Sequence, residues 1–159
     1  MAGDDRYSYI KNCVINQSYN RAIGLSGVNN LLIDNNVVYQ ATGNAIFTGY
    51  GTEKNNTITR NLLIDTRKSW VLQESDIKPA SFYLNSPGNT LENNQAAGSD
   101  NYGYLFDLKE NSEGPLFSLD ICPVYAQFGV FNDNVAHSNL QGLSILTNYS
   151  PRTFQCLPL

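Results

Sequence analysis

The chain has 159 residues, of which 42% are hydrophobic and 15% are charged, and its formal net charge is −4. This length suits one domain with its own apolar core, and the low share of charged residues excludes a disordered chain. The negative charge argues against nucleic acid as a partner, and no stretch approaches the roughly 18 apolar residues of a membrane span, so we expect no direct membrane insertion by this segment.

An internal repeat is marked by asparagine, which occurs 21 times in the chain. The repeated unit has five residues, with an apolar residue at the first position and, in four of five copies, asparagine at the fourth. The copies begin at Ile10, Ile33, Ile58, Leu91 and Phe131. Steps of 23 and 25 residues separate the first three copies, a period typical of repeat architectures built from short strands.

A second apolar strand centre follows each copy of the unit, at Ile23, Ile46, Phe82, Tyr104 and Leu143. It comes nine or ten residues after the fourth position in four copies, but 21 residues after Asn61. We therefore expect an insertion of about eleven residues at about 66–80. The long step before Asn134 indicates a second insertion at about 107–127.

These features predict an all-β fold, a right-handed parallel β-helix of about five coils that forms a single domain over residues 1–159. Asparagine tolerates the left-handed conformation of a sharp bend, and amides stacked about 4.8 Å apart on successive coils can form a hydrogen-bonded ladder. We assign this ladder to Asn36, Asn61, Asn94 and Asn134. The regular spacing argues against the alternative, an antiparallel β-sandwich. One short helical turn is expected within Trp70 to Ile77.

Two carboxylates are the candidates for catalysis. Asp34 and Glu92 both follow the first residue of the unit, a position expected to face outward. Two rungs would separate them by about 9.6 Å, the outer limit for an inverting glycosidase. A mixed column of solvated side chains is the more ordinary explanation of this pattern.

A metal site of two or three histidines is excluded, because His137 is the only histidine. We assign His137 a structural hydrogen-bonding role. No resident cofactor is predicted, and Ca²⁺ is the one ion for which the chain offers candidate ligands. These are Asp4, Asp5, Asp65 and Asp76.

The three cysteines include no Cys-x-x-Cys pair, so the common zinc and thioredoxin-like motifs are absent. Cys13 stands at the ladder position of the first unit, where we expect it to be buried and free. Cys122 and Cys156 are the candidates for a disulfide in an oxidising compartment. N-glycosylation sequons begin at Asn16, Asn55 and Asn148, about the number that this asparagine content would produce by chance.

Seven segments, taken together and in order, carry a resemblance to a known family. They are Tyr9-Ile10-Lys11-Asn12-Cys13, Tyr19-Asn20-Arg21-Ala22, Val28-Asn29-Asn30-Leu31-Leu32-Ile33, Pro79-Ala80-Ser81-Phe82, Asn94-Gln95-Ala96-Ala97-Gly98-Ser99, Tyr102-Gly103-Tyr104 and Asn134-Val135-Ala136-His137-Ser138-Asn139. The chain thereby resembles the β-helix region of the fibrocystin and fibrocystin-L family, which also includes the G8-domain hyaluronan depolymerases of animals.

The resemblance implies a fragment of a larger extracellular or cell-surface protein, with the ciliary membrane as one location. It implies a non-catalytic role, structural, adhesive or receptor-like. Its partners would be an extracellular protein or glycan and the adjacent coils or domains of the same larger chain. The alternative is a segment of a secreted or membrane-anchored, hyaluronan-type depolymerase, whose His-Phe-His segment and G8 portion would lie ahead of Met1. We therefore expect this segment not to be an enzyme by itself.

Overall fold

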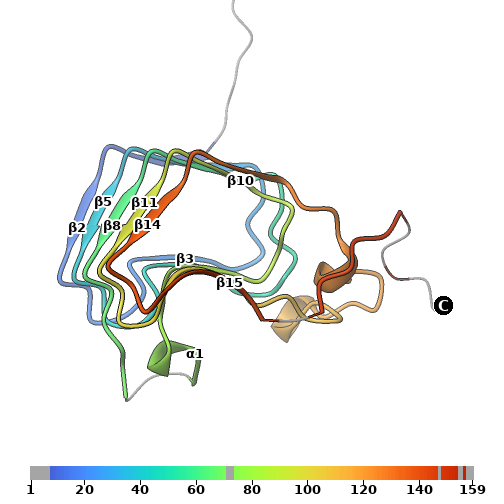
Figure 1. Cartoon of the computed structure of the whole chain (residues 1–159). Coiled ribbons are helices and arrows are strands. Elements are labelled where there is room, and N and C mark those ends of the chain that lie inside the picture. Colours follow the sequence, from blue (N-terminus) through green and yellow to red (C-terminus); the bar gives the residue numbers. More distant parts are fainter. Residues whose placement is uncertain (1–7, 71–73, 147, 154–155, 157–159) are drawn as a thin grey trace, which may run out of the picture.

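The computed structural model describes residues 8–70, 74–146, 148–153 and 156, and these form a parallel β-helix (Figure 1). The strands make three parallel sheets of five strands each. Sheet A contains β1 (Ser8–Lys11), β4 (Leu31–Asp34), β7 (Thr57–Thr59), β10 (Thr90–Glu92) and β13 (Val130–Asn132). Sheet B contains β2 (Val14–Asn16), β5 (Val37–Tyr39), β8 (Leu62–Ile64), β11 (Gln95–Ala97) and β14 (Val135–His137). Sheet C contains β3 (Ile23–Leu25), β6 (Ile46–Thr48), β9 (Ala80–Leu84), β12 (Tyr102–Phe106) and β15 (Gln141–Ile145).

The register of the strands follows the repeat that the sequence predicts. In sheet A the paired residues are the first positions of the five units, which run from Ile10 to Phe131. In sheet C the five predicted strand centres, from Ile23 to Leu143, are likewise paired one above the other. The predicted parallel β-helix of five coils is therefore confirmed.

The core is the inside of the coil, where each sheet contributes one column of apolar side chains. Ile58, Leu63 and Phe82, from three different sheets, all have an exposed fraction of 0%. Phe82 stacks on Tyr104 of the next coil with ring centroids 4.6 Å apart. Because strands alternate their side chains between two faces, the residue after each core position points outward.

The predicted asparagine ladder runs through the bend between sheets A and B. The amide oxygen of Asn61 accepts hydrogen bonds from the backbone N–H and the side-chain amide of Asn36, at 3.0 and 2.9 Å. Asn94 accepts the same two bonds from Asn61, and Asn134 accepts them from Asn94. Each buried amide thus ties its coil to the next.

The prediction was wrong in giving the ladder asparagines the left-handed conformation as well. The positive φ angles belong to the residue just before each ladder position, namely Asn12, Asn35, Arg60, Asn93 and Asp133, with φ between 51° and 58°. The bend is therefore made by the third residue of the unit, whose side chain points to solvent. This leaves the fourth residue free to turn its amide inward.

A second buried ladder was not predicted. At the bend before sheet A, the amide oxygen of Asn89 accepts bonds from the backbone N–H and the side-chain amide of Asn56, at 3.1 and 3.0 Å. The Asn56 oxygen accepts the backbone N–H of Leu31 at 2.9 Å. The sequence signal for this second ladder is an asparagine directly ahead of each of the strands that begin at Thr57 and Thr90.

Two long connections leave the regular coil. The first joins β8 to β9 and contains the short helix α1 (Glu74–Ile77), within the segment where a helical turn was predicted; residues 71–73 of that segment lie outside the described residues. The second joins β12 to β13 and contains the 3-10 helices η1 (Gly114–Leu116) and η2 (Pro123–Tyr125). The second connection also contributes to the core, because Val124 is only 5% exposed. No helix among the described residues is long and apolar enough to cross a membrane.

Cys13 is exposed, so the prediction that it is buried was wrong. It belongs to the first coil of the described chain, and no described coil stacks on its outer side to cover it. Its thiol lies 3.3 Å from the carbonyl oxygen of Lys11. The ladder therefore has no side-chain amide at its first position, where Cys13 stands.

Candidate functional site

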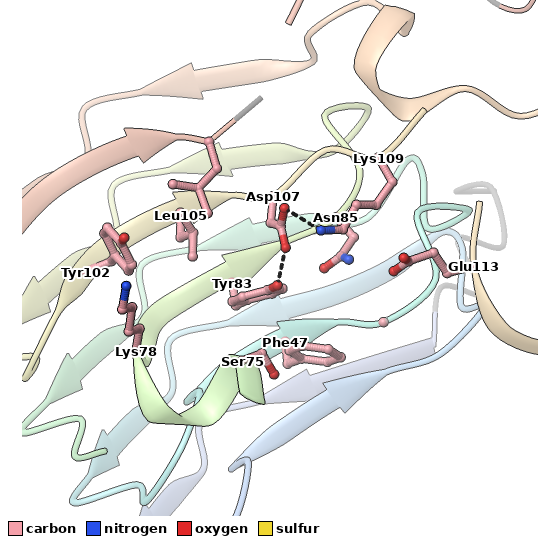
Figure 2. Close-up of a pocket in the computed structure, with 12 residues that line it drawn as sticks. Phe47, Ser75, Lys78, Tyr83, Asn85, Tyr102, Leu105, Asp107, Lys109 and Glu113 are labelled. Carbon is pink, nitrogen blue, oxygen red and sulfur yellow. Dashed lines mark hydrogen bonds and ion pairs between the residues drawn. The ribbon is translucent and has the colours of Figure 1, made fainter. Parts of the chain in front are cut away.

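A cleft of about 580 Å³ opens on the outer face of sheet C (Figure 2). Its floor is apolar and aromatic and comes from three neighbouring strands, with Phe47 on β6, Tyr83 on β9, and Tyr102 and Leu105 on β12. Phe47, Tyr83 and Leu105 point outward because the residues next to them fill the core, and Tyr102 packs in the same cluster beside Gly103, which has no side chain. The two long connections flank the cleft, and they supply most of its polar rim: Ser75, Lys78, Asp107, Lys109 and Glu113.

A hydrogen-bonded trio occupies one side of the cleft. The hydroxyl of Tyr83 donates to Oδ2 of Asp107 at 2.5 Å, and Nζ of Lys109 lies 2.8 Å from Oδ1 of the same carboxylate (Figure 2). Burial and then the bond to Asp107 raise the pKa of Tyr83 far above its ordinary value, so the phenol stays protonated. Both oxygens of Asp107 are therefore engaged by neighbours.

Two aromatic rings in the floor of the cleft stack on each other, and a guanidinium group covers one of them. The rings of Phe47 and Tyr83 lie with centroids 5.0 Å apart, and the guanidinium carbon of Arg21 lies 3.5 Å from the centroid of the Phe47 ring. Beside them lies Asn85, which is 4% exposed and whose amide oxygen accepts no hydrogen bond from any described residue. The cleft therefore combines aromatic side chains with polar groups at its edge, a composition that suits a sugar ring.

The predicted pair Asp34 and Glu92 lies elsewhere, on the outer face of sheet A. The two residues occupy one column, separated by Thr59 as predicted. Asp34 is 1% exposed and is held between Arg60, at 2.7 and 2.9 Å, and Lys11, at 3.2 Å. The structure therefore places neither carboxylate in the cleft, and a catalytic role for them stays a hypothesis.

Stability at acid pH is expected to depend on Asp34. The hydrogen bonds from Arg60 lower the pKa of Asp34 below its ordinary value; burial opposes this shift and Lys11 adds to it. Because the folded pKa lies below the unfolded one of about 3.9, the stabilisation is complete above about pH 5 and is lost as the pH falls through the folded pKa. Asp34→Asn should therefore flatten the decline of unfolding free energy below about pH 4. Urea unfolding at several pH values measures this slope.

Arg60→Gln provides the matched comparison for that experiment. It should flatten the same dependence of unfolding free energy on pH. The double variant should show little further change, because both substitutions remove the same ion pair. Salt should weaken the effect, since 61% of the Arg60 side chain is exposed. An unchanged acid slope in Asp34→Asn would contradict the assignment.

The other predicted acidic residues have protein partners. Asp65 pairs with Arg67 at 2.6 Å, and this contact lowers the pKa of Asp65. Asp76 is 1% exposed, and its Oδ1 accepts the side-chain amide of Asn44 at 2.8 Å. Among the residues that the structure describes, no group of three or more His, Cys, Asp or Glu side chains is placed to hold a metal ion. The candidates Asp4 and Asp5 lie outside the described residues.

The remaining predicted residues are His137, two cysteines and the three sequon asparagines. His137 is exposed on β14, with Nδ1 3.2 Å from the hydroxyl of its neighbour Ser138. Cys122 and Cys156 are joined by a disulfide, with Cα atoms 5.5 Å apart. The three sequon asparagines are all exposed: Asn16, Asn55 and Asn148.

Sequence reasoning did not identify the cleft. Tyr83 and Phe47 each follow a predicted strand centre, so their outward orientation could have been deduced from strand alternation. Asp107 was noted only as the start of an insertion. Its contact with Tyr83 joins residues 24 positions apart, and no local pattern indicates such a pair.

Comparison with known proteins gives one family and several relatives. The model of the CEMIP β-helix family matches residues 1–143. Fibrocystin-L of Mus musculus is 36% identical over 153 residues, which cover 95% of this chain and 4% of that protein. The cell migration-inducing and hyaluronan-binding protein of Mus musculus is 31% identical over 92% of this chain and 13% of its own length. The human cell surface hyaluronidase CEMIP2 is 28% identical over 94% of this chain and 13% of its length. The chain thus spans a small part of each relative.

Proposed function

Because this chain belongs to the CEMIP β-helix family, we propose that it is a non-catalytic extracellular segment of a fibrocystin-like surface protein that binds a glycan in the cleft on sheet C. Its role would be adhesive or receptor-like. The β-helix acts as a rigid scaffold, and its two long connections shape the recognition surface, as loops on rigid scaffolds often do.

The observation that carries this proposal is the composition of the cleft. Phe47, Tyr83 and Tyr102 line the cleft with aromatic rings, and Asn85 and Lys78 place polar groups beside them. Aromatic side chains with adjacent hydrogen-bonding groups match the alternating apolar and hydroxyl-bearing surfaces of a sugar. Two relatives bear names that refer to hyaluronan, which supports a glycan as the class of ligand.

The non-catalytic part of the proposal rests on the hydrogen bonds of the carboxylates in the cleft. Glycoside hydrolysis uses two carboxyl groups, one of which must donate a proton. In the cleft, Asp107 is engaged by Tyr83 and Lys109 on both oxygens. Glu113 is exposed at the rim. One free carboxylate does not supply the pair that hydrolysis needs.

Glycan binding should depend on Tyr102. We expect Tyr102→Ala to weaken binding of the best oligosaccharide from a glycan panel about tenfold, which corresponds to the loss of one stacking contact of about 1.4 kcal/mol. Titration calorimetry with the full chain measures this affinity. Tyr19→Ala is the control, because Tyr19 is 87% exposed and does not line the cleft.

Two results of the calorimetric titration would count against glycan binding in the cleft. Equal weakening by Tyr102→Ala and Tyr19→Ala would contradict the assignment of the cleft, as would no binding to any glycan on the panel. The melting temperature of each variant shows whether a lost affinity reflects loss of fold, since Tyr102 is only 8% exposed.

A depolymerase segment is the second candidate function. Asp107 and Glu113 line the same cleft, and one relative is named as a hyaluronidase. Incubation with high-molecular-weight hyaluronan, followed by size-exclusion chromatography, distinguishes the two functions. Shortening of the polymer that disappears in Asp107→Asn would overturn the non-catalytic proposal, whereas glycan binding without shortening supports it.

The extracellular and ciliary location is part of the same proposal. The Cys122–Cys156 disulfide and the exposed sequon asparagines suit an oxidising, secretory route. Immunofluorescence of unpermeabilised cells from the source organism tests both points. Signal only inside the cells would contradict the proposal, and surface signal away from cilia would restrict it to the cell surface.

A further inference from the structure

The outer face of sheet B carries an uncharged strip of side chains. It consists of two columns that the strand pairing aligns, the first being Val14, Val37, Leu62, Gln95 and Val135, and the second being Asn16, Tyr39, Ile64, Ala97 and His137. Neither column contains Asp, Glu, Lys or Arg. No described segment crosses the outer side of this sheet, at the left of Figure 1.

Apolar side chains of the strip are open to solvent. Val14 is 74% exposed, Val135 is 46% exposed and Tyr39 is 42% exposed. Sheet A differs, because its outer face carries the ion pairs of Asp34 with Lys11 and Arg60. An apolar surface on a rigid sheet usually marks a place that another group covers.

One residue of the strip is a sequon asparagine. Asn16 begins Asn16-Gln17-Ser18 and ends β2, and it is exposed. Its amide makes no hydrogen bond to any residue that the structure describes. The chain turns immediately afterwards, at Gln17 with φ 53°, so Asn16 is the last side chain of β2 on this face.

Tyr39 is the direct strand neighbour of Asn16. Paired residues of adjacent strands lie about 4.8 Å apart and their side chains point to the same face. A sugar attached to the Asn16 amide would therefore begin within contact distance of the Tyr39 ring, with Ile64 next in the column. The apolar face of a pyranose stacks favourably on such a ring.

We propose that Asn16 carries an N-linked glycan whose first N-acetylhexosamine packs on Tyr39 and Ile64 and so covers these two side chains of the strip. The modification stabilises the fold by burying these apolar side chains. The sequon at Asn55 differs in its surroundings, because the cleft beside it has no aromatic side chain in its lining. The inference rests on the extracellular location in the proposed function and is independent of glycan binding in the cleft on sheet C.

The test uses the full chain secreted from a eukaryotic cell line. Glycopeptide mass spectrometry should find Asn16 occupied. Enzymatic removal of the glycan from the folded protein should lower the melting temperature by about 2 to 4 °C, and Ser18→Ala should do the same. The key comparison is Tyr39→Thr, which keeps the sequon but removes the ring. In that background, loss of the Asn16 glycan should change the melting temperature much less.

Asn55→Gln is the matched control. Its effect on the melting temperature should be the same whether residue 39 is tyrosine or threonine. An unoccupied Asn16, or an equal effect of glycan loss with and without Tyr39, would overturn the inference. Self-association of the secreted, glycosylated chain that Tyr39→Thr abolishes would also overturn it, because the strip would then be covered by a second copy. A chain with a Tyr39-dependent glycan but no ligand in its cleft would refute the proposed function alone.

Discussion

Asn61→Ala is expected to lower the free energy of unfolding by roughly 2 to 6 kcal/mol, the largest effect of any single substitution considered for this chain. The side chain of Asn61 is 1% exposed and links three coils. Its amide nitrogen donates to the carbonyl of Ile33 at 2.9 Å and to Asn94 at 3.0 Å, while its oxygen accepts both bonds from Asn36. Alanine would leave a buried N–H and a buried carbonyl without partners, each costing about 1 to 3 kcal/mol.

Urea unfolding followed by far-UV circular dichroism measures this loss. Asn132→Ala is the control, because Asn132 is exposed on β13 and, among the described residues, its amide donates only to the neighbouring Asp133. The control should change the stability by less than about 0.5 kcal/mol. A loss below about 1 kcal/mol in Asn61→Ala would show that the ladder is not a principal source of stability.

Removal of the disulfide is expected to cost about 3 to 4 kcal/mol. Cys122 and Cys156 are 34 residues apart, and the loop between them contains the whole fifth coil. Closing a loop of this length restricts the unfolded chain by about that free energy. The double variant Cys122→Ala with Cys156→Ala should therefore unfold at a clearly lower urea concentration than the unmodified chain.

Cys13→Ala is the matched control for the disulfide. Cys13 is free and exposed, so its loss should change the stability by less than about 0.5 kcal/mol. The last segment of the chain is also held to η2 by backbone bonds from Ser150 to Val124 and from Arg152 to Tyr125, at 3.0 and 2.9 Å. If these bonds alone fix the segment, the double variant will lose less than about 1 kcal/mol, which would contradict the expected role of the disulfide.

The position of the cleft follows from how the coil tolerates insertions. Both long connections leave or enter sheet C, and their ends lie on the same side of it as Tyr83. Lys78 comes from the first connection and Lys109 from the second. A coil without insertions would present only a flat strand face here, so the two connections turn an ordinary sheet surface into a concave one.

The repeat determined the architecture by itself. Each coil must place one apolar residue of every strand inside and pair with its neighbours in register, and this requirement imposes the regular spacing that begins at Ile10. The ladder was predictable for the same reason, because a stacked amide at Asn61 needs its counterparts at Asn36 and Asn94. These spacings are properties of the strands and bends, so they do not depend on the conformation of the two long connections.

Only the tertiary structure decided which side chains meet outside the coil. The paths of the two connections are not constrained by the repeat, so the contact of Asp107 with Tyr83 could not be deduced from spacing. The environment of Asp34 depends on two cations from neighbouring coils, Lys11 and Arg60, whose side chains converge only after the strands have stacked. The sequence specifies periodic burial through strand alternation, whereas the site depends on non-periodic contacts between segments far apart in the chain.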